Sequence, residues 1–263
     1  MSKSFSVVFI SDIVGEDAVD FLIEKLPIIK QTYQPEFLIA NAENAHNGKG
    51  VSVGIASKLK RAGFDCLTSG NHIWDIRQRD ILNDEKWNNF VLRPANYPQS
   101  LPGKGYIKLR KENLELMVVN VQGTVYMESI DSPFRFFDDH IMKFRVDTKN
   151  ILVDFHAEAT SEKKAIFHHL NGRVSAVLGT HTHVQTADEF VSDEGTGFIS
   201  DAGMTGPMNS VIGMDTESAL RRFREKIPVH YKLAKGLIQI EGVALHIDPQ
   251  TGKCTHLERI QIK

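Results

Sequence analysis

Gly179-Thr180-His181-Thr182-His183 places two histidines two residues apart, directly after the apolar run at residues 174–178. An apolar run of this length is typical of a strand that is covered on both faces. Side chains two residues apart on an extended chain point to the same side, so both imidazoles can face one point beyond the strand. Ligands of open α/β sheets bind at the carboxyl ends of the strands. The stretch therefore indicates either a binding site or, since the chain has 11 histidines, two solvated loop histidines.

Polar residues also follow four other apolar runs that the pattern predicts to be strands. These runs lie at residues 6–10, 37–40, 65–69 and 151–155. Helical spacing follows at 16–34, 52–61 and 160–170, with Thr160 as the expected N-cap and Lys163 onward on the helix surface. Alternating strands and helices predict parallel βα units and an α/β fold. The residues at the ends of these strands are Asp12, Glu43, Asn44, Asn71, His72 and His156.

The rest of the chain predicts further strands and helices without a linker, repeat or low-complexity segment. We expect one domain over residues 1–263. The expected strands lie at 89–92, 106–109, 114–121, 190–191 and 197–199, and a terminal hairpin at 236–247 and 255–262. The expected helices lie at 134–144 and 217–226, and the polar segment 122–134 is expected to be a loop.

The composition restricts the kinds of partner and the cellular compartment that we expect for this protein. The chain has 263 residues, 41% of them hydrophobic, and a formal net charge of −2. Without a global basic field, we expect no long nucleic-acid duplex as partner. Its two cysteines, Cys66 and Cys254, imply no disulfide framework and fit a reducing compartment. Neither a signal peptide nor an apolar stretch long enough for a bilayer is present, so we expect a cytoplasmic protein with no membrane partner.

Each polar residue at a strand end also has an ordinary interpretation. Asp12 could cap the following helix, Asn44 and Asn71 could be turn residues, and His156 could be a buried histidine with its hydrogen bonds satisfied. Glu43 fits such an interpretation less well, because a carboxylate there is costly unless paired or solvated. All of these interpretations must hold at once if there is no site. Oxygen and imidazole ligands from five strand ends favour a pair of hard or borderline metal ions instead.

In this order along the chain, these residues resemble the calcineurin-like metallophosphoesterases, and more closely their YmdB-like branch. The resemblance extends from residue 11 to about residue 215. It implies a sandwich of two mixed β-sheets flanked by helices. The motifs that carry it are Ser11-Asp12-Ile13-Val14-Gly15, Asn41-Ala42-Glu43-Asn44-Ala45, Gly70-Asn71-His72-Ile73-Trp74-Asp75, Arg93-Pro94-Ala95-Asn96-Tyr97-Pro98, Val153-Asp154-Phe155-His156-Ala157-Glu158, Gly179-Thr180-His181-Thr182-His183 and Gly203-Met204-Thr205-Gly206-Pro207.

The chain departs from the wider superfamily at three points. Asp12-Ile13-Val14 lacks the histidine of the usual Asp-x-His, and Ala42-Glu43-Asn44 replaces Gly-Asp-x-x-Asp. Both changes match the YmdB-like branch and leave one metal with fewer nitrogen ligands. In the superfamily, an acidic residue usually follows Gly-Asn-His and orients the catalytic histidine. In this chain that position is occupied by Ile73. Asp75, two residues further on, is the candidate substitute.

The resemblance implies a dinuclear metal site. One metal would be held by Asp12, Glu43, Asn44 and His183, and the other by Glu43, Asn71, His156 and His181. Glu43 would bridge the two ions, which would share a hydroxide nucleophile. His72 is not an expected ligand; it would protonate the leaving oxygen or stabilise the developing charge. The donor set, which lacks thiolates, suits iron or manganese first, with magnesium as another option.

By the same resemblance, the substrate is a small phosphoester, in particular a 2′,3′-cyclic or 3′,5′-cyclic nucleotide. Two alternatives stay open: a phosphomonoesterase or nucleotidase on the same site, and a regulatory protein that binds a nucleotide with little turnover. A homo-oligomer is also left open. We expect base selection from the loops at 47–50, 123–134 and 201–213. The side chains that could form an apolar wall there, or be plain packing residues, are Met204, Met208, Met214, Tyr126 and Phe134.

Overall fold

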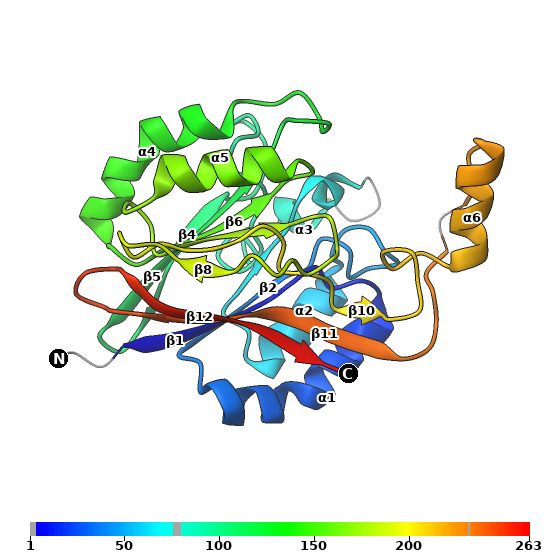
Figure 1. The fold of residues 1–263 in the computed structure, drawn as a ribbon, viewed down its shortest axis with the longest axis horizontal. Coiled ribbons are helices and arrows are strands. Elements are labelled where there is room, and N and C mark those ends of the chain that lie inside the picture. Colours follow the sequence, from blue (N-terminus) through cyan, green and yellow to red (C-terminus); the bar gives the residue numbers. More distant parts are fainter. Residues whose placement is uncertain (1–3, 76–79, 231) are drawn as a thin grey trace.

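Two β-sheets lie face to face, with helices on the outer side of each (Figure 1). The structure is a computed structural model that describes residues 4–75, 80–230 and 232–263. Over these residues each sheet has six strands. The two mixed sheets flanked by helices confirm the fold class expected from the sequence.

The first sheet combines the N-terminal and C-terminal parts of the chain. Its order is β10-β11-β1-β2-β3, and β12 pairs with β11. β1, β2 and β3 are parallel, whereas β11 runs antiparallel to β1 and to β12. The strands are β1 (Phe5–Ile10), β2 (Phe37–Asn41), β3 (Cys66–Thr68), β10 (Gly206–Pro207), β11 (Ile238–Ile247) and β12 (Cys254–Ile262).

The second sheet is built from the middle of the chain. Its order is β4-β5-β6-β7-β9-β8, with β5, β6, β7 and β9 parallel and the two edge strands antiparallel. The strands are β4 (Tyr106–Lys111), β5 (Leu114–Gln122), β6 (Ile151–His156), β7 (Ala176–Thr180), β8 (Phe190–Val191) and β9 (Gly197–Ile199).

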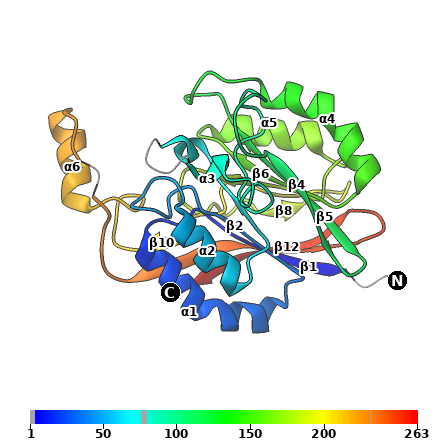
Figure 2. The same ribbon diagram turned by 180° about the vertical axis from the view of Figure 1, so that it is seen from behind.

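Helices cover the outer faces of both sheets. α1 (Glu16–Tyr33) and α2 (Val53–Ala62) lie side by side on the first sheet, as the view from behind shows (Figure 2). α4 (Pro133–Asp147) and α5 (Thr160–Leu170) cover the second sheet. Shorter elements are the 3₁₀ helix η1 (Asn71–Trp74) and α3 (Asp80–Asn83). α6 (Thr216–Glu225) projects from the body of the protein (Figure 1).

Alternating side chains of each strand fill different layers of the core. In β1, Val7 and Phe9 pack between the two sheets, whereas Val8 and Ile10 belong to the layer under α1 and α2. In β6, Leu152 lies between the sheets and Phe155 packs in the layer with α4 and α5. Because both faces of these strands are buried, their sequences are continuous apolar runs rather than alternating ones.

Two local predictions are wrong. Residues 89–92 form no strand: 85–90 are turns, and Val91 and Leu92 make only single bridges. Pro94 follows closely and has no N–H with which to continue a ladder. In α5 the N-cap position is Ala159, without a side-chain cap, rather than Thr160.

The third correction concerns Lys163, which is 2% exposed rather than on the helix surface. Its ammonium lies 2.8 Å from the buried carboxylate of Asp201, and this ion pair offsets the cost of burying the charge. The spacing of Lys163 to Ile166, Phe167 and Leu170 already places it on the apolar side of α5.

None of the helices over the described residues combines the length and the apolar character that a membrane span requires.

Candidate active site

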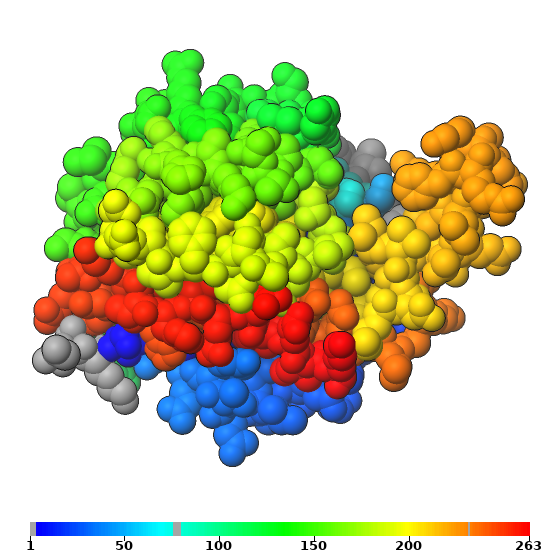
Figure 3. Space-filling model, in the orientation of Figure 1, coloured from blue at the N-terminus to red at the C-terminus, as the bar shows by residue number. Residues whose placement is uncertain are grey.

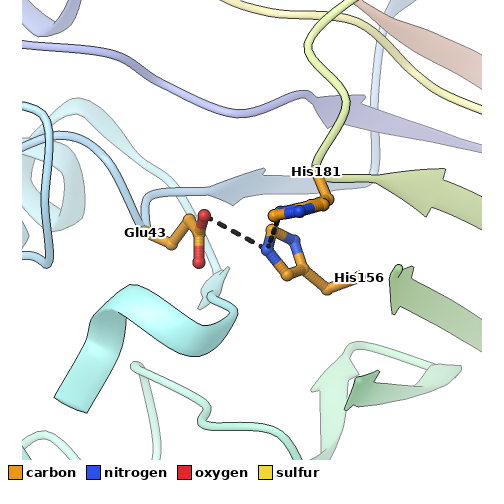
Figure 4. A group of neighbouring side chains, drawn as sticks. All are labelled: Glu43, His156 and His181. Carbon is orange, nitrogen blue, oxygen red and sulfur yellow. Dashed lines mark hydrogen bonds and ion pairs between the residues drawn. The ribbon is translucent and has the colours of Figure 1, made fainter. Parts of the chain in front are cut away.

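The two sheets bring the carboxyl ends of five strands to one place. Asp12 follows β1, Glu43 and Asn44 follow β2, and Asn71 and His72 follow β3 in the first sheet. In the second sheet His156 ends β6, and His181 and His183 follow β7. Figure 4 shows Glu43 pointing across from its loop toward His156 and His181. Asp12 is not a helix cap, because the N-cap of α1 is Gly15.

Two groups of donor atoms share Glu43. In the first, ligand atoms of Glu43, His156 and His181 lie within 4.8 Å of one another, and in the second those of Asp12, Glu43 and His183 do. The Nε2 atom of His156 lies 3.1 Å from Glu43 Oε1 and 3.1 Å from His181 Nδ1. One carboxylate that belongs to two donor groups is the arrangement that a bridging ligand requires.

Two buried oxygens at this place have no hydrogen-bond partner among the described residues. They are Oδ1 of Asp12 and Oδ1 of Asn71. A buried polar atom without a partner costs about 1–3 kcal/mol, so such atoms normally bind something. Carboxylate and amide oxygens beside imidazole nitrogens are suitable donors for a divalent metal ion. The residues present therefore fit a metal centre.

Asn44 contacts both donor groups through its amide. Its Nδ2 lies 3.1 Å from Glu43 Oε1 and 3.1 Å from His183 Nε2, while Oδ1 faces His72. A carboxamide binds a cation through oxygen. The expected role of Asn44 as a ligand therefore requires its amide group to be turned over relative to this structure.

Burial and mutual charge shift the pKa values of this cluster in opposite directions. Burial alone would raise the pKa of Glu43, but His156 and His72 hold it well below its usual range. Burial would lower the pKa of His156, yet Glu43, Asp12 and Asp154 raise it to about 9. Burial also raises the pKa of Asp12 well above its usual range. Glu43 and His156 thus form an ion pair. A metal ion that binds His156 would displace the second proton of its imidazolium ring.

The other two histidines are held neutral. Burial, followed by the charge of His156, lowers the pKa of His181 to about 3, and burial lowers that of His183. His183 Nδ1 donates to the carbonyl of Ile212 at 2.9 Å, which leaves its Nε2 lone pair toward Asn44. Neutral imidazole with a free nitrogen lone pair is the form that binds a metal.

Behind His156 lies Asp154, which the sequence analysis did not assign to the site. This fully buried carboxylate accepts hydrogen bonds from Thr68, from Asn41 at 2.9 Å and from the Thr180 hydroxyl at 2.7 Å. Since that hydroxyl has one proton, its oxygen accepts from His156 Nδ1 at 2.9 Å and turns Nε2 toward Glu43. A charged residue inside an apolar strand was the signal, because burial of an unpaired carboxylate is costly.

A second supporting group fixes the loop of His181 and His183, both of which have positive φ values of 97° and 63°. Thr182 between them donates its N–H and its hydroxyl to Asp201 Oδ2, at 3.0 and 2.7 Å. The same oxygen accepts from Lys163 Nζ at 2.8 Å. The buried Lys163–Asp201 pair therefore holds two histidines in a backbone conformation that non-glycine residues rarely adopt.

His72 sits at the edge of the cluster, with 31% of its side chain exposed. Its Nδ1 lies 2.6 Å from Asn44 Oδ1 and 3.3 Å from Glu43 Oε1, and its backbone N–H donates to Glu43 Oε2. The preceding Gly70 has no room for a Cβ, which would collide with His156 and Glu43. The candidate orienting residue Asp75 donates its backbone N–H to the His72 carbonyl at 3.0 Å. A role for its carboxylate stays a prediction.

A cavity of about 620 Å³ opens from this cluster. Its inner end is lined by Glu43, Asn44, His72, His181 and His183, and its outer end by residues of α6 and of the segment before it. Of the loops expected to select a base, 47–50 and the end of 201–213 line the cavity, whereas 123–134 does not. Of the five side chains expected at an apolar wall, only Met214 lines the described cavity; Met204 is buried elsewhere, and Tyr126 is 90% exposed.

Two mixed sheets with ligand-type residues at the meeting carboxyl ends of their strands define a metallophosphoesterase fold. A crystal structure of a phosphatase from Mycoplasma pneumoniae superposes with a TM-score of 0.92 at 32% identity, covering 100% of this chain and 94% of that one. A crystal structure of a hypothetical protein from Thermus thermophilus gives 0.90 at 36% identity, covering 98% and 99% of the two chains.

The sequence comparisons point to one family within this class. The family model described as "YmdB-like protein" matches residues 8–260. A relative from Bacillus subtilis, named 2′,3′-cyclic-nucleotide 2′-phosphodiesterase, is 43% identical over 256 residues, which cover 97% of this chain and 96% of the relative. The chain belongs to the YmdB-like protein family, and the resemblance seen in the sequence is confirmed.

Proposed function

We propose that the protein is a metal-dependent phosphodiesterase that hydrolyses small cyclic nucleotides, with 2′,3′-cyclic monophosphates as the first candidates and 3′,5′-cyclic ones as the second. It is a phosphoric ester hydrolase, the class to which its relatives' names refer. The observation that carries the proposal is the buried Glu43, shared by two donor groups at the inner end of a cavity. The similarity to the Bacillus subtilis phosphodiesterase supports the choice of substrate.

Seven residues would hold two metal ions in this proposal. Asp12, Glu43, Asn44 and His183 would bind one ion, and Glu43, Asn71, His156 and His181 the other. When bound, the ions would supply positive charge for the phosphate oxygens and lower the pKa of a water molecule. Iron or manganese is the first choice, because the site combines oxygen and imidazole donors and contains no thiolate.

His72 is the proposed catalytic residue that is not a ligand. It lines the cavity, so its ring can reach a substrate, and it approaches Glu43 and Asn44 through Nδ1 only. That contact leaves Nε2 as the atom that can donate a proton to a leaving oxygen. Asn44 can hold Nδ1 in either orientation of its amide, since the group offers a donor and an acceptor.

The experiment that tests the proposal measures metal content and turnover on the same sample, purified without chelator. We expect two metal ions per chain and hydrolysis of 2′,3′-cyclic AMP that is lost on chelation and restored by Mn²⁺ or Fe²⁺. Tight nucleotide binding without turnover would overturn the proposal and favour a regulatory protein.

A phosphomonoesterase on the same site is the second candidate, because the Mycoplasma pneumoniae relative is described as a phosphatase. Bis-p-nitrophenyl phosphate and p-nitrophenyl phosphate separate the two. We expect the diester to be hydrolysed faster, and a strong preference for the monoester would favour the second candidate.

The single domain over residues 1–263, the cytoplasmic location and the absence of a nucleic-acid duplex or membrane partner stay predictions, and a homo-oligomer stays open.

A further inference from the structure

The cavity is longer than the dinuclear site requires. Its volume of about 620 Å³ lies in the usual range for small-molecule sites, about 300–1,000 Å³. The proposed ligands and His72 occupy only the inner end. The outer end is walled by α6, which stands out from the body of the protein (Figure 3), and by Ile212 and Met214. A ligand whose phosphate lies at the inner end therefore has room for a larger group at the outer end.

Two neighbouring side chains of α6 face this outer end. They are Arg222 and Phe223, both of which line the cavity. Phe223 is 63% exposed although it is a large apolar residue. The guanidinium of Arg222 has no hydrogen-bond or ion-pair partner in the part of the chain that the structure describes. An exposed aromatic face and an unpaired set of five N–H donors thus border the same space.

The rest of α6 provides a contrast. Leu220 is 53% exposed but does not line the cavity. Arg221 does not line it either, and its Nε donates to Glu225 Oε2 at 2.9 Å within the same helix. Within the described residues, the arginine that lines the cavity is therefore unpaired, whereas its neighbour Arg221 is paired within the helix.

We propose that the outer end of the cavity is the nucleoside-binding part of the site, with Phe223 as the stacking surface for the base and Arg222 as a hydrogen-bond donor to its acceptors. The proposal rests on the proposed function, since it assumes a nucleotide whose phosphate lies at the inner end. Every nucleobase has a π-face, and stacking on an aromatic side chain contributes about 1–3 kcal/mol per base. A guanidinium plane both stacks on bases and donates to their edges.

The test compares one substrate that has a base with one that lacks it: 2′,3′-cyclic AMP and ribose 2′,3′-cyclic phosphate. We expect Phe223→Ala to raise KM for 2′,3′-cyclic AMP roughly 5- to 160-fold, the range that corresponds to loss of one stacking contact. Arg222→Gln should raise it less, by about 2- to 13-fold. Neither variant should change kcat/KM for the ribose compound by more than about twofold, because that compound does not reach α6.

Matched controls come from the same helix. Leu220→Ala removes another exposed apolar side chain, and Arg221→Gln removes a guanidinium outside the cavity. Both should leave KM for 2′,3′-cyclic AMP unchanged, and circular dichroism should show that all four variants fold.

An unchanged KM for 2′,3′-cyclic AMP in Phe223→Ala would overturn the inference, and so would an equal rise for both substrates. A fall in oligomer mass of Phe223→Ala at unchanged KM would also overturn it and show that α6 contacts a second copy. The proposed function fails separately, if the wild-type protein turns over neither substrate.

Discussion

The two ends of the cavity differ in how firmly their side chains are fixed. At the inner end Asp12, Glu43 and His156 are fully buried, and further buried groups hold the histidines in place. At the outer end Phe223 is largely exposed on a projecting helix. Groups that stabilise a transition state must be held in place before the substrate binds. Contacts to the variable part of a substrate need less rigidly fixed side chains. We therefore expect the inner end to carry out catalysis and the outer end to select the substrate.

Replacement of the shared carboxylate should break the inner end completely. In Glu43→Gln the neutral amide should bridge two cations poorly, so both metals should be lost or weakly bound and turnover abolished. Metal analysis and a 2′,3′-cyclic AMP assay check this, with Glu225→Gln on α6 as the control that keeps both. Two metals and a normal rate in Glu43→Gln would show that Glu43 is not the bridge.

Loss of His72 should separate catalysis from metal binding at the same end. His72→Ala should keep both metals while turnover falls roughly 10²- to 10⁴-fold, the usual contribution of a general acid. The loss should be smaller with p-nitrophenyl leaving groups, which need little protonation. His46→Ala is a matched control, since its side chain is 26% exposed and lies outside the cavity. A near-normal rate would make His72 a turn residue, and loss of metal would make it a ligand.

Loss of the buried Lys163–Asp201 ion pair tests whether the groups that hold the histidine loop also contribute to the free energy of unfolding. Lys163→Met leaves the Asp201 carboxylate buried without its cation, which should lower the free energy of unfolding by about 3–5 kcal/mol. The neighbouring Lys164 is half exposed and 3.3 Å from Asp188, so Lys164→Met should cost at most about 1 kcal/mol. Urea denaturation of both variants measures this, and equal costs would contradict the distinction.

The smallest expected effect is the pH dependence of the affinity for metal ions. Because the pKa of His156 is raised to about 9, this residue is protonated at pH 7 in the metal-free protein and must lose that proton to become a ligand. Affinity for Mn²⁺ should therefore rise with pH, about tenfold per unit for each displaced proton, up to about pH 9. Isothermal titration calorimetry between about pH 6.5 and 8, in buffers of different ionisation enthalpy, counts the protons released. An affinity independent of pH would contradict the Glu43–His156 ion pair.

The inner end could be predicted from the sequence because its residues obey a topological rule. Parallel strands with continuous apolar runs end at one edge of a sheet, so Asp12 and Glu43 had to come near each other in one sheet, and His156 and His181 in the other. The rule concerns backbone positions. It does not say how an amide such as that of Asn44 is turned, which depends on side-chain contacts.

The outer end could not be predicted in the same way. α6 has the pattern of an ordinary polar surface helix, and only its placement in the fold brings Phe223 to the cavity. That placement depends on the geometry of the loops before and after the helix, which no periodicity encodes. For Lys163 two signals in the sequence conflicted, because its spacing in the helix favoured burial while its charge favoured the surface. Its ion pair with Asp201, which is distant in the sequence, makes burial possible.

The pairing of β1 with β11 has a consequence for the order in which the chain can fold during synthesis. Phe5 faces Ile247 across this ladder, and Ile10 faces Gly242. The second sheet draws its strands from residues 106–199 and can pair as soon as these have left the ribosome. β1 must wait for more than two hundred further residues before its outer neighbour exists. A nascent chain released before residue 238 would carry His156, His181 and His183 on a complete second sheet, while the first sheet would end in an exposed edge on β1.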